Sequence, residues 1–166
     1  MVVQHKIGDL FDSNADVIVH QVNCRGVMGS GVAKQVKARF PETFRKYVHV
    51  CETFERYFSL DKLLGRALLT SESFNGRRVY IANLFAQKNY GRDGKCYTHY
   101  GAFREALRSA ASQISPLGKL KVAMPYRIGC DRGGGDWNTV LSIIEQEFGD
   151  FDVTLYELTQ EKKGEL

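Results

Sequence analysis

The sequence predicts an α/β fold in which a mostly parallel sheet is covered by helices on both faces. Short apolar, β-branched runs alternate along the chain with segments whose apolar residues recur at helical spacing, a pattern typical of parallel sheets. Two glycine-rich loops each follow an expected strand and precede an expected helix. The chain of 166 residues is the size of one domain and is long enough for a substantial core.

Six strands and four helices are expected, without internal repeats or a linker. Residues 17–19 are a β-branched apolar run, which predicts a buried strand. Apolar residues recur at helical spacing from Val32 to Phe40, and Pro41 ends that pattern. The expected strands are residues 2–6, 17–21, 66–70, 78–84, 121–125 and 153–158. The expected helices are residues 31–39, 42–55, 98–114 and 136–148.

The first glycine-rich loop, residues 26–31, lies between the second strand and the first helix. The first N–H groups of a helix have no partner within it, and the helix dipole favours negative charge there. Glycines let the backbone approach a phosphate without an intervening Cβ. A P-loop would need a lysine after Gly31, where Val32 stands, and in a dinucleotide fingerprint begun at Gly29 the third glycine position is Lys34. The loop predicts a phosphate site of neither kind.

The second glycine-rich loop, residues 128–135, follows the fifth strand. It leads into a helix that Asp136 is placed to cap, with its carboxylate accepting from backbone N–H groups. The loop ends in three consecutive glycines, which cost backbone entropy and which an ordinary surface turn does not require. The sequence therefore contains two candidate anion-binding loops.

Composition and charge limit the partners to expect. The net charge of +4 would assist binding of an anionic ligand. The chain lacks a basic run interleaved with aromatic residues, so nucleic acid is not expected as a partner. It also lacks an apolar stretch near 18 residues and a signal peptide, so no membrane association is expected and a cytoplasmic location is predicted.

The four cysteines at positions 24, 51, 96 and 130 show no C-x-x-C pairing and no histidine at zinc-finger spacing. We therefore expect reduced thiols, no metal and no cofactor. Cys24 and Cys130 fall next to or within the glycine-rich loops, where a nucleophile is conceivable. Packing roles are favoured because nothing in the sequence indicates a histidine held against either sulfur.

Several motifs occur in an order that resembles one known family. They are Gly8-Asp9-Leu10, VIVHQVN at 17–23, GVMGSGVA at 26–33, YIANLFAQKNYGRDGKCYTHY at 80–100, MPYRIGCDRGGGDW at 124–137 and VTLYEL at 153–158. The chain resembles the macrodomains, which bind ADP-ribose. The resemblance is to the compact bacterial and phage type, near the terminal ADP-ribose protein glycohydrolases and ADP-ribose-1″-phosphate phosphatases. It implies a three-layer α/β/α domain over residues 1–160 with a mixed, mostly parallel sheet, followed by a polar tail at 161–166.

The resemblance also implies a binding site. Asp9 would accept a hydrogen bond from the adenine amino group, Leu10 and Tyr156 would pack on the ring, and Asn23 would contact the distal ribose. The residues implied to bind the ligand are Asp9, Leu10, Asn23, Gly26, Val27, Met28, Gly29, Ser30, Gly31, Val32, Ile128, Gly129, Cys130, Gly133, Gly134, Gly135 and Tyr156.

Structural roles stay open for several of these polar and aromatic residues. Asp9 could form an ordinary Asx turn, and Tyr156 could be a core or edge tyrosine. His20 and Gln21, just before Asn23, could be satisfied interior polar residues.

Catalytic residues are less clearly indicated. The glycohydrolase branch uses a lysine that attacks the distal ribose and an aspartate in the second loop. The resemblance puts Tyr97 near the lysine position and Gly133 at the aspartate position. The candidates in this chain are Asp131, Lys95 and His99, with Asp131 ranked above Lys95.

Two functions follow from the resemblance. In the first, the chain would bind ADP-ribose and hydrolyse a derivative at the distal ribose, releasing a phosphate, an acyl group or a protein side chain. Alternatively, it is a reader that recognises ADP-ribose or ADP-ribosylated protein and performs no chemistry. A nucleic-acid-associated domain is a third class, which would show steep salt dependence of its affinity.

Overall fold

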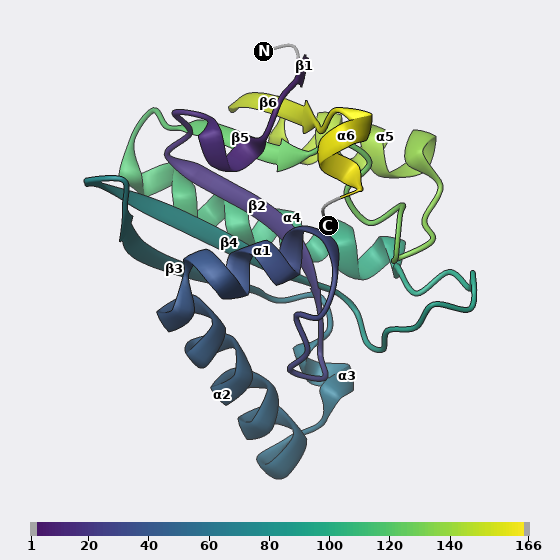
Figure 1. Cartoon of the computed structure of the whole chain (residues 1–166). Helices are drawn as coiled ribbons and strands as arrows, with labels where there is room; N and C mark the ends of the chain where they lie inside the picture. The colour runs from purple at the N-terminus through teal and green to yellow at the C-terminus, as the bar shows by residue number, and fades with distance from the viewer. Residues whose placement is uncertain (1–2, 165–166) are drawn as a thin grey trace.

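A six-stranded sheet forms the middle of the molecule in the computed structural model, which describes residues 3–164 (Figure 1). The strand order is β1-β6-β5-β2-β4-β3. Every neighbouring pair is parallel except the β3–β4 hairpin. The strands are β1 Gln4–Ile7, β2 Val17–Asn23, β3 Ala67–Phe74, β4 Arg77–Gln87, β5 Lys121–Pro125 and β6 Asp152–Glu157. The predicted mixed, mostly parallel sheet is confirmed.

Helices cover both faces of this sheet and complete three layers. Helices α1, α2 and α3 contribute buried side chains to one core cluster, and α4 and α5 contribute theirs to the other. The helices are α1 Gly31–Arg39, α2 Pro41–Tyr57, α3 Leu60–Leu63, α4 Tyr100–Ile114, α5 Trp137–Phe148 and α6 Gln160–Lys163. Leu10–Asp12 and Ser115–Leu117 form 3₁₀ turns. None of the helices between residues 3 and 164 is long and apolar enough to cross a membrane.

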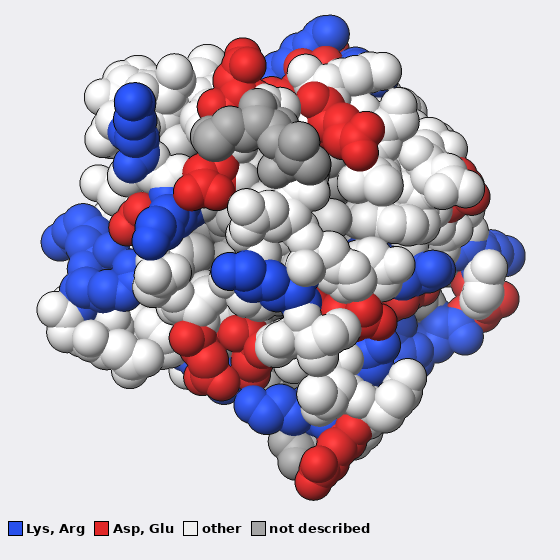
Figure 2. Space-filling model, turned by 90° about the horizontal axis from the view of Figure 1, so that it is seen from above, with Lys and Arg blue, Asp and Glu red and all other residues white. Residues whose placement is uncertain are grey.

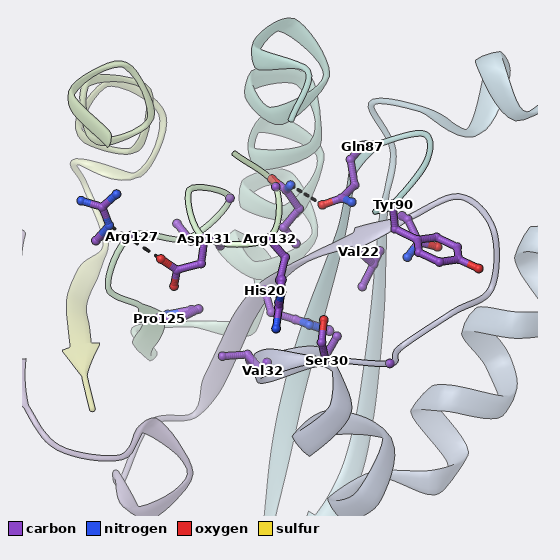
Figure 3. A pocket seen from close by; sticks show the side chains of 18 of the residues that line it. His20, Val22, Ser30, Val32, Gln87, Tyr90, Pro125, Arg127, Asp131 and Arg132 are labelled. Carbon is purple, nitrogen blue, oxygen red and sulfur yellow. Dashed lines mark hydrogen bonds and ion pairs between the residues drawn. The ribbon is translucent and has the colours of Figure 1, made fainter. Parts of the chain in front are cut away.

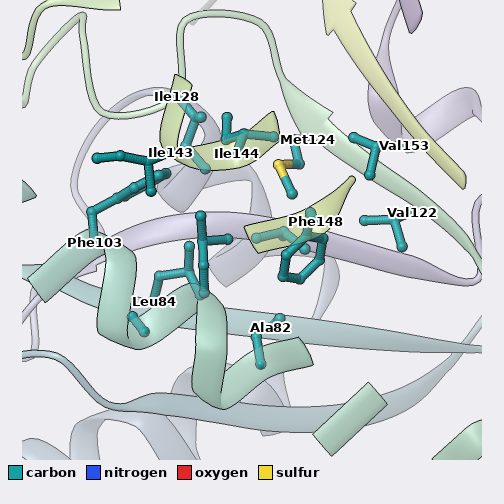
Figure 4. Close-up of a cluster of buried hydrophobic side chains, with 14 of the residues drawn as sticks. Ala82, Leu84, Phe103, Val122, Met124, Ile128, Ile143, Ile144, Phe148 and Val153 are labelled. Carbon is teal, nitrogen blue, oxygen red and sulfur yellow. The ribbon is translucent and has the colours of Figure 1, made fainter. Parts of the chain in front are cut away.

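The central strands are buried on both faces, which explains their continuous apolar sequence. In β2, Val17 and Val19 join the cluster under α4 and α5, whereas Ile18 and Val22 join the cluster under α1 and α2. Figure 4 shows the first cluster, where side chains of β4 and β5 meet Phe103 of α4 and others of α5.

Several elements differ from the sequence expectation, and one of them is the short helix α6, which was not predicted. Helix α3 was not predicted; it is one turn long and is held by burial of Leu60 and Leu63. The β3–β4 hairpin is longer than expected because its strands pair as far as Phe74 and Arg77, across a turn in which Asn75 has φ +50° and Gly76 has φ +78°. The expected strand at 2–6 runs from Gln4 to Ile7, and residue 2 lies outside the described part of the chain.

The fold brings the loops of interest to one edge of the sheet. Strands β1, β6, β5, β2 and β4 run parallel in that spatial order, so the segments that follow them emerge at the same edge. In open α/β sheets this carboxyl edge is where ligands bind. The turn after β1 lies at one end of the row and the loops after β2 and β4 lie toward the other.

Candidate functional site

A cleft of about 240 Å³ opens at the carboxyl edge of the sheet. Its walls come from the first glycine-rich loop, the second glycine-rich loop and the segment after β4. Figure 3 shows Ser30 and Val32 on one side, Asp131 and Arg132 on the opposite side, and His20 between them. The two loops that the sequence predicts as anion sites therefore face each other across one cavity.

Asn23, the last residue of β2, holds the first loop in shape. Its Oδ1 accepts from the backbone N–H of Arg25 at 2.9 Å and from the Tyr47 hydroxyl at 2.8 Å. Its Nδ2 donates to the carbonyl of Val27 at 2.7 Å. Asn23 and Tyr47 are both buried, so this network holds the loop in place from its buried side. The network uses one Nδ2 hydrogen, which leaves the other for a ligand in the cleft that Asn23 lines.

The start of α1 presents backbone donors to the cleft. Ser30 is the N-cap residue, but its side chain makes no capping hydrogen bond. Gly31 has φ +59°, and no atom lies within 4 Å of the position that its Cβ would take. Both residues line the cleft. A helix N-terminus of this kind attracts an anion through its N–H groups and its dipole.

The second loop is shaped by close packing against residues 95–98. The Gly133 carbonyl accepts from the backbone N–H groups of Tyr97 at 2.7 Å and Thr98 at 3.0 Å. A Cβ on Gly133 would lie 2.4 Å from Thr98 Oγ1, and one on Gly134 would lie 2.5 Å from the Lys95 carbonyl oxygen. At least two of the three consecutive glycines are therefore required by this packing, whatever the loop binds.

Replacing Gly133 by alanine should destabilise the protein. The added Cβ meets Thr98 Oγ1 and also the Gly129 carbonyl oxygen, 2.6 Å away, so the loop must shift. Overpacking of this kind costs about 1–3 kcal/mol of unfolding free energy. Urea unfolding of Gly133→Ala should show this loss, whereas Gly29→Ala, whose nearest neighbour is at 3.5 Å, should change stability little. Equal stability of the two variants would contradict the packing explanation.

Two residues that line the cleft, His20 and Gln21, each carry a buried acceptor without a partner among residues 3–164. The Asn83 amide donates to the Leu68 carbonyl at 2.8 Å, which turns Asn83 Oδ1 toward His20 Nε2 at 2.7 Å. Nε2 therefore carries the proton and His20 Nδ1 is the unpaired acceptor. Gln21 Nε2 donates to Gln87 and Thr98, and Gln21 Oε1 is left unpaired.

His20 and Gln21 are therefore interior polar residues that are only partly satisfied among residues 3–164. An unpaired buried acceptor costs about 1–3 kcal/mol, so a ligand that brings hydroxyl donors would relieve this cost. Both residues line the cleft.

His20 should make stability depend on pH. Burial lowers the pKa of His20 to about 4, from 6.5 in an exposed chain, and the hydrogen bond to Asn83 only partly opposes this. Between pH 6.5 and pH 4, His20 is protonated in the unfolded state but neutral in the folded state. The free energy of unfolding is therefore highest above pH 6.5 and falls as the pH drops toward 4. Over this interval the free energy of unfolding falls by about 3 kcal/mol.

This pH dependence can be isolated with one substitution. Urea unfolding of the wild type and of His20→Gln between pH 4 and 7.5 should show a steeper loss for the wild type, because only it carries the imidazole. Parallel pH profiles would contradict a neutral, buried His20.

Arginines dominate the charge of the cleft. Arg92, Arg127 and Arg132 line it, and Asp131 is the one carboxylate among its described lining residues. Arg127 Nε lies 3.8 Å from Asp131 Oδ1. Arg127 also adopts φ +63°, a left-handed conformation that is uncommon for a residue other than glycine. The excess of positive charge favours a phosphorylated ligand.

A second hollow, of about 450 Å³, lies beside the turn after β1 and is lined in part by Asp9, Tyr156 and Lys162. Asp9 Oδ1 accepts from the Phe11 N–H at 3.0 Å, so the Asx turn does form. Asp9 Oδ2 lies 3.8 Å from Lys162 Nζ. Because β1 pairs with β6 and β6 pairs with β5, all in parallel, this hollow and the cleft lie along the same edge of the sheet.

The structure distributes the predicted binding residues over three environments. The cleft is lined by Asn23, Val27, Gly29, Ser30, Gly31, Val32, Ile128, Gly129 and Gly133. Asp9 and Tyr156 line the second hollow. Leu10 is buried and does not line it. The predicted residues that line neither cavity are Leu10, Gly26, Met28, Cys130, Gly134 and Gly135.

Only one of the three catalytic candidates lines the cleft. Asp131 does so, with its side chain 81% exposed. Lys95 lies outside, 76% exposed and 3.7 Å from Asp93. His99 caps α4, with Nδ1 accepting from the Ala102 N–H at 3.0 Å, and also lies outside the cleft lining.

The cysteines near the loops are packing residues, as predicted. Cys24 and Cys130 are buried, and burial raises the pKa of the Cys24 thiol to about 12 and that of Cys130 to about 11. Both thiols are therefore protonated and weakly nucleophilic at neutral pH. Within residues 3–164, no three His, Cys, Asp or Glu side chains gather into a metal-binding group.

Fold and cleft together define a class: a three-layer α/β/α domain with an arginine-lined cleft between two glycine-rich loops at the carboxyl edge of its sheet. The family model described as "Macro domain" matches residues 19–144. The chain belongs to the Macro domain family.

Known proteins of this family are similar to nearly the whole chain. An ADP-ribose 1″-phosphate phosphatase of Saccharomyces cerevisiae is 28% identical over 169 residues, covering 88% of this chain and 92% of that protein. A DNA ADP-ribosyl glycohydrolase of Mycobacterium tuberculosis is also 28% identical; the match covers 93% of this chain but 42% of that longer protein. The macrodomain of Mycobacterium tuberculosis DarG superposes with a TM-score of 0.73 at 27% identity, covering 93% of this chain and 97% of that chain.

Proposed function

We propose that this protein binds ADP-ribose along the carboxyl edge of its sheet. The observation that carries the proposal is the cleft between two facing glycine-rich loops, whose lining residues His20 and Gln21 each keep a buried acceptor without a donor among residues 3–164. The distal ribose supplies hydroxyl donors for these acceptors, and the diphosphate lies against the start of α1.

The rest of the ligand fits the remaining features of the edge. The arginines of the cleft offset the two negative charges of the diphosphate. The adenine reaches the second hollow, where Asp9 Oδ2 accepts from its amino group and Tyr156 offers an aromatic face. Without the Asp9 acceptor, the hollow would discriminate less between adenine and bases that lack the amino group.

We further propose that the protein hydrolyses an ADP-ribose derivative at the distal ribose. The similarity to a phosphatase and a glycohydrolase that act on ADP-ribose derivatives supports this proposal. Asp131 is the carboxylate on the cleft that can orient a water or assist the leaving group. The group released is a phosphate, an acyl group or an ADP-ribosylated side chain.

A non-catalytic reader is the second candidate, and one observation favours it. Lys95 lies outside the cleft lining, and Asp131 is held near Arg127 on the exposed rim. A reader would use the same binding residues, and its partner would be ADP-ribose itself or an ADP-ribosylated protein.

Turnover separates the two candidates. The protein is incubated with ADP-ribose-1″-phosphate, O-acetyl-ADP-ribose and ADP-ribosylated protein, and release of ADP-ribose is followed by mass spectrometry. Release from at least one substrate is expected. Binding of ADP-ribose without release from any of the three would instead assign the protein as a reader.

A further inference from the structure

A network of hydrogen bonds connects segments that surround the cleft, and Gln21 of β2 is its central member. Gln21 Nε2 donates to Gln87 Oε1 at 2.7 Å (Figure 3) and to Thr98 Oγ1 at 2.8 Å. Gln87 Nε2 donates onward to the backbone carbonyl of Asn89 at 2.7 Å, and Thr98 Oγ1 donates to that of Gly129 at 2.6 Å. This Gln21 network therefore joins β2, the end of β4 and the second glycine-rich loop.

Both ends of the Gln21 network are backbone carbonyls, which can only accept hydrogen bonds. The Thr98 hydroxyl gives its single hydrogen to Gly129, so its oxygen must accept from Gln21. The Gln87 amide donates to Asn89, so it presents its oxygen to Gln21. Both hydrogens of Gln21 Nε2 are thereby used. The orientation of the Gln21 amide is fixed, and Oε1 is its atom without a partner among residues 3–164.

Thr98 lies behind the cleft lining and is held by contacts of its own. It is buried, with 6% of its surface exposed, and it does not line the cleft. Its backbone N–H donates to the Gly133 carbonyl at 3.0 Å. A Cβ on Gly129 would lie 2.7 Å from Gln21 Oε1, so the glycine leaves the space beside this oxygen free of a side chain. Thr98 is therefore fixed in place and fixes in turn two residues of the cleft lining, Gln21 and Gly129.

The Gln21 network consists of amide, hydroxyl and carbonyl groups, none of which is charged. Charged side chains dominate elsewhere: basic and acidic side chains are interspersed on the face that Figure 2 shows, and arginines line the cleft. Attraction between charges weakens as salt is added, whereas neutral groups keep the same hydrogens between about pH 6 and 8. The contribution of the Gln21 network to binding should therefore be independent of pH in this range.

We propose that Thr98 and Gln87 are positioning residues that hold Gln21 as an acceptor for a hydroxyl group of the distal ribose. This inference rests on the proposed binding of ADP-ribose, which pairs that ribose with Gln21. An acceptor that is already oriented in the free protein needs no reordering when the ligand binds. Without the Thr98 hydroxyl, one hydrogen of Gln21 Nε2 would lose its acceptor, and Gln21 and Gly129 would have to rearrange.

Calorimetry with ADP-ribose and ADP tests the inference, because ADP lacks the distal ribose. Thr98→Val removes the hydroxyl but keeps the shape of the side chain. It should bind ADP-ribose about 3- to 10-fold more weakly than the wild type, the factor that one hydrogen bond contributes to an equilibrium, and should bind ADP as the wild type does. Thr98→Ser keeps the hydroxyl and should restore the affinity for ADP-ribose.

The matched control is Thr70→Val. Thr70 is also a buried threonine, 5% exposed, and its hydroxyl pairs with Thr43 Oγ1 at 2.8 Å, but neither residue lines the cleft. Thr70→Val therefore removes a buried hydroxyl without touching the Gln21 network. It should bind both ligands as tightly as the wild type.

Unchanged ADP-ribose affinity in Thr98→Val would overturn the inference. An equal loss for ADP and ADP-ribose would overturn it too, because a general structural defect acts on both ligands. If Thr98→Val does not fold, Gln87→Leu removes the other acceptor of Gln21 Nε2 and must show the same selective loss. The ratio of wild-type to variant affinity should be the same at about pH 6 and pH 8. A wild type that gives no heat with ADP-ribose would instead refute the proposed function.

Discussion

Gly31→Val should weaken ADP-ribose binding by about 100-fold while the protein stays folded. Gly31 lines the cleft at the start of α1, and the position of its Cβ is open space. A valine there would fill the approach to the helix N-terminus and separate the phosphate from its N–H donors. Losing one or two hydrogen bonds to a charged group, at about 1.5–3 kcal/mol each, gives a loss of this size.

The matched control for Gly31→Val is Gly76→Val. Both glycines have positive φ, +59° and +78°, and neither has an atom within 4 Å of its Cβ position. Gly76 lies in the β3–β4 turn and does not line the cleft. Each valine should cost about 1–3 kcal/mol of stability through backbone strain. Only Gly31→Val should lose affinity, and wild-type affinity in that variant would rule out the first loop as the phosphate site.

Asp131→Ala should lower the turnover of an ADP-ribose derivative by about 100- to 10,000-fold, the usual contribution of a positioned acid or base. Affinity for ADP-ribose should change by no more than a few-fold, because Asp131 lies on the rim and is 81% exposed. Turnover and calorimetry on the same preparation separate the chemical step from binding.

Lys95→Ala is the comparison for Asp131→Ala. Lys95 is also charged and exposed but lies outside the cleft lining, near Asp93, so its loss should leave turnover unchanged. If Lys95→Ala alone abolishes turnover and borohydride traps a lysine adduct, the lysine is the nucleophile and the role proposed for Asp131 is wrong.

Elements with strong local patterns could be predicted from the sequence. The strand at 17–21 and the helix at 31–39 were predicted because a β-branched run and the spacing of apolar residues are visible within a few neighbouring residues. Helix α3 was missed because a single turn carries no such periodicity and depends on burial of Leu60 and Leu63. The ends of β3 and β4 were also set too short, since cross-strand pairing rather than apolar sequence extends them to Phe74 and Arg77.

The site was only partly predictable, because part of it depends on contacts between residues far apart in the sequence. The first loop was found because its glycines precede a helix in sequence. Tyr90 and Arg92, which also line the cleft, lie in the motif at 80–100, but nothing in that motif singles them out as binding residues. The unpaired acceptor on His20 depends on Asn83, which lies 63 residues away in the chain. No neighbouring residue in the sequence indicates which nitrogen is protonated.

ADP-ribose binding at the carboxyl edge of the sheet is tested most directly by titration calorimetry of the purified protein with ADP-ribose. The two glycine-rich loops, the cleft arginines and the unpaired acceptors of His20 and Gln21 predict a dissociation constant of about 1 μM or lower, equivalent to about −8 kcal/mol or better. An absence of heat at millimolar ADP-ribose, together with no competition against any labelled adenine nucleotide, would contradict it.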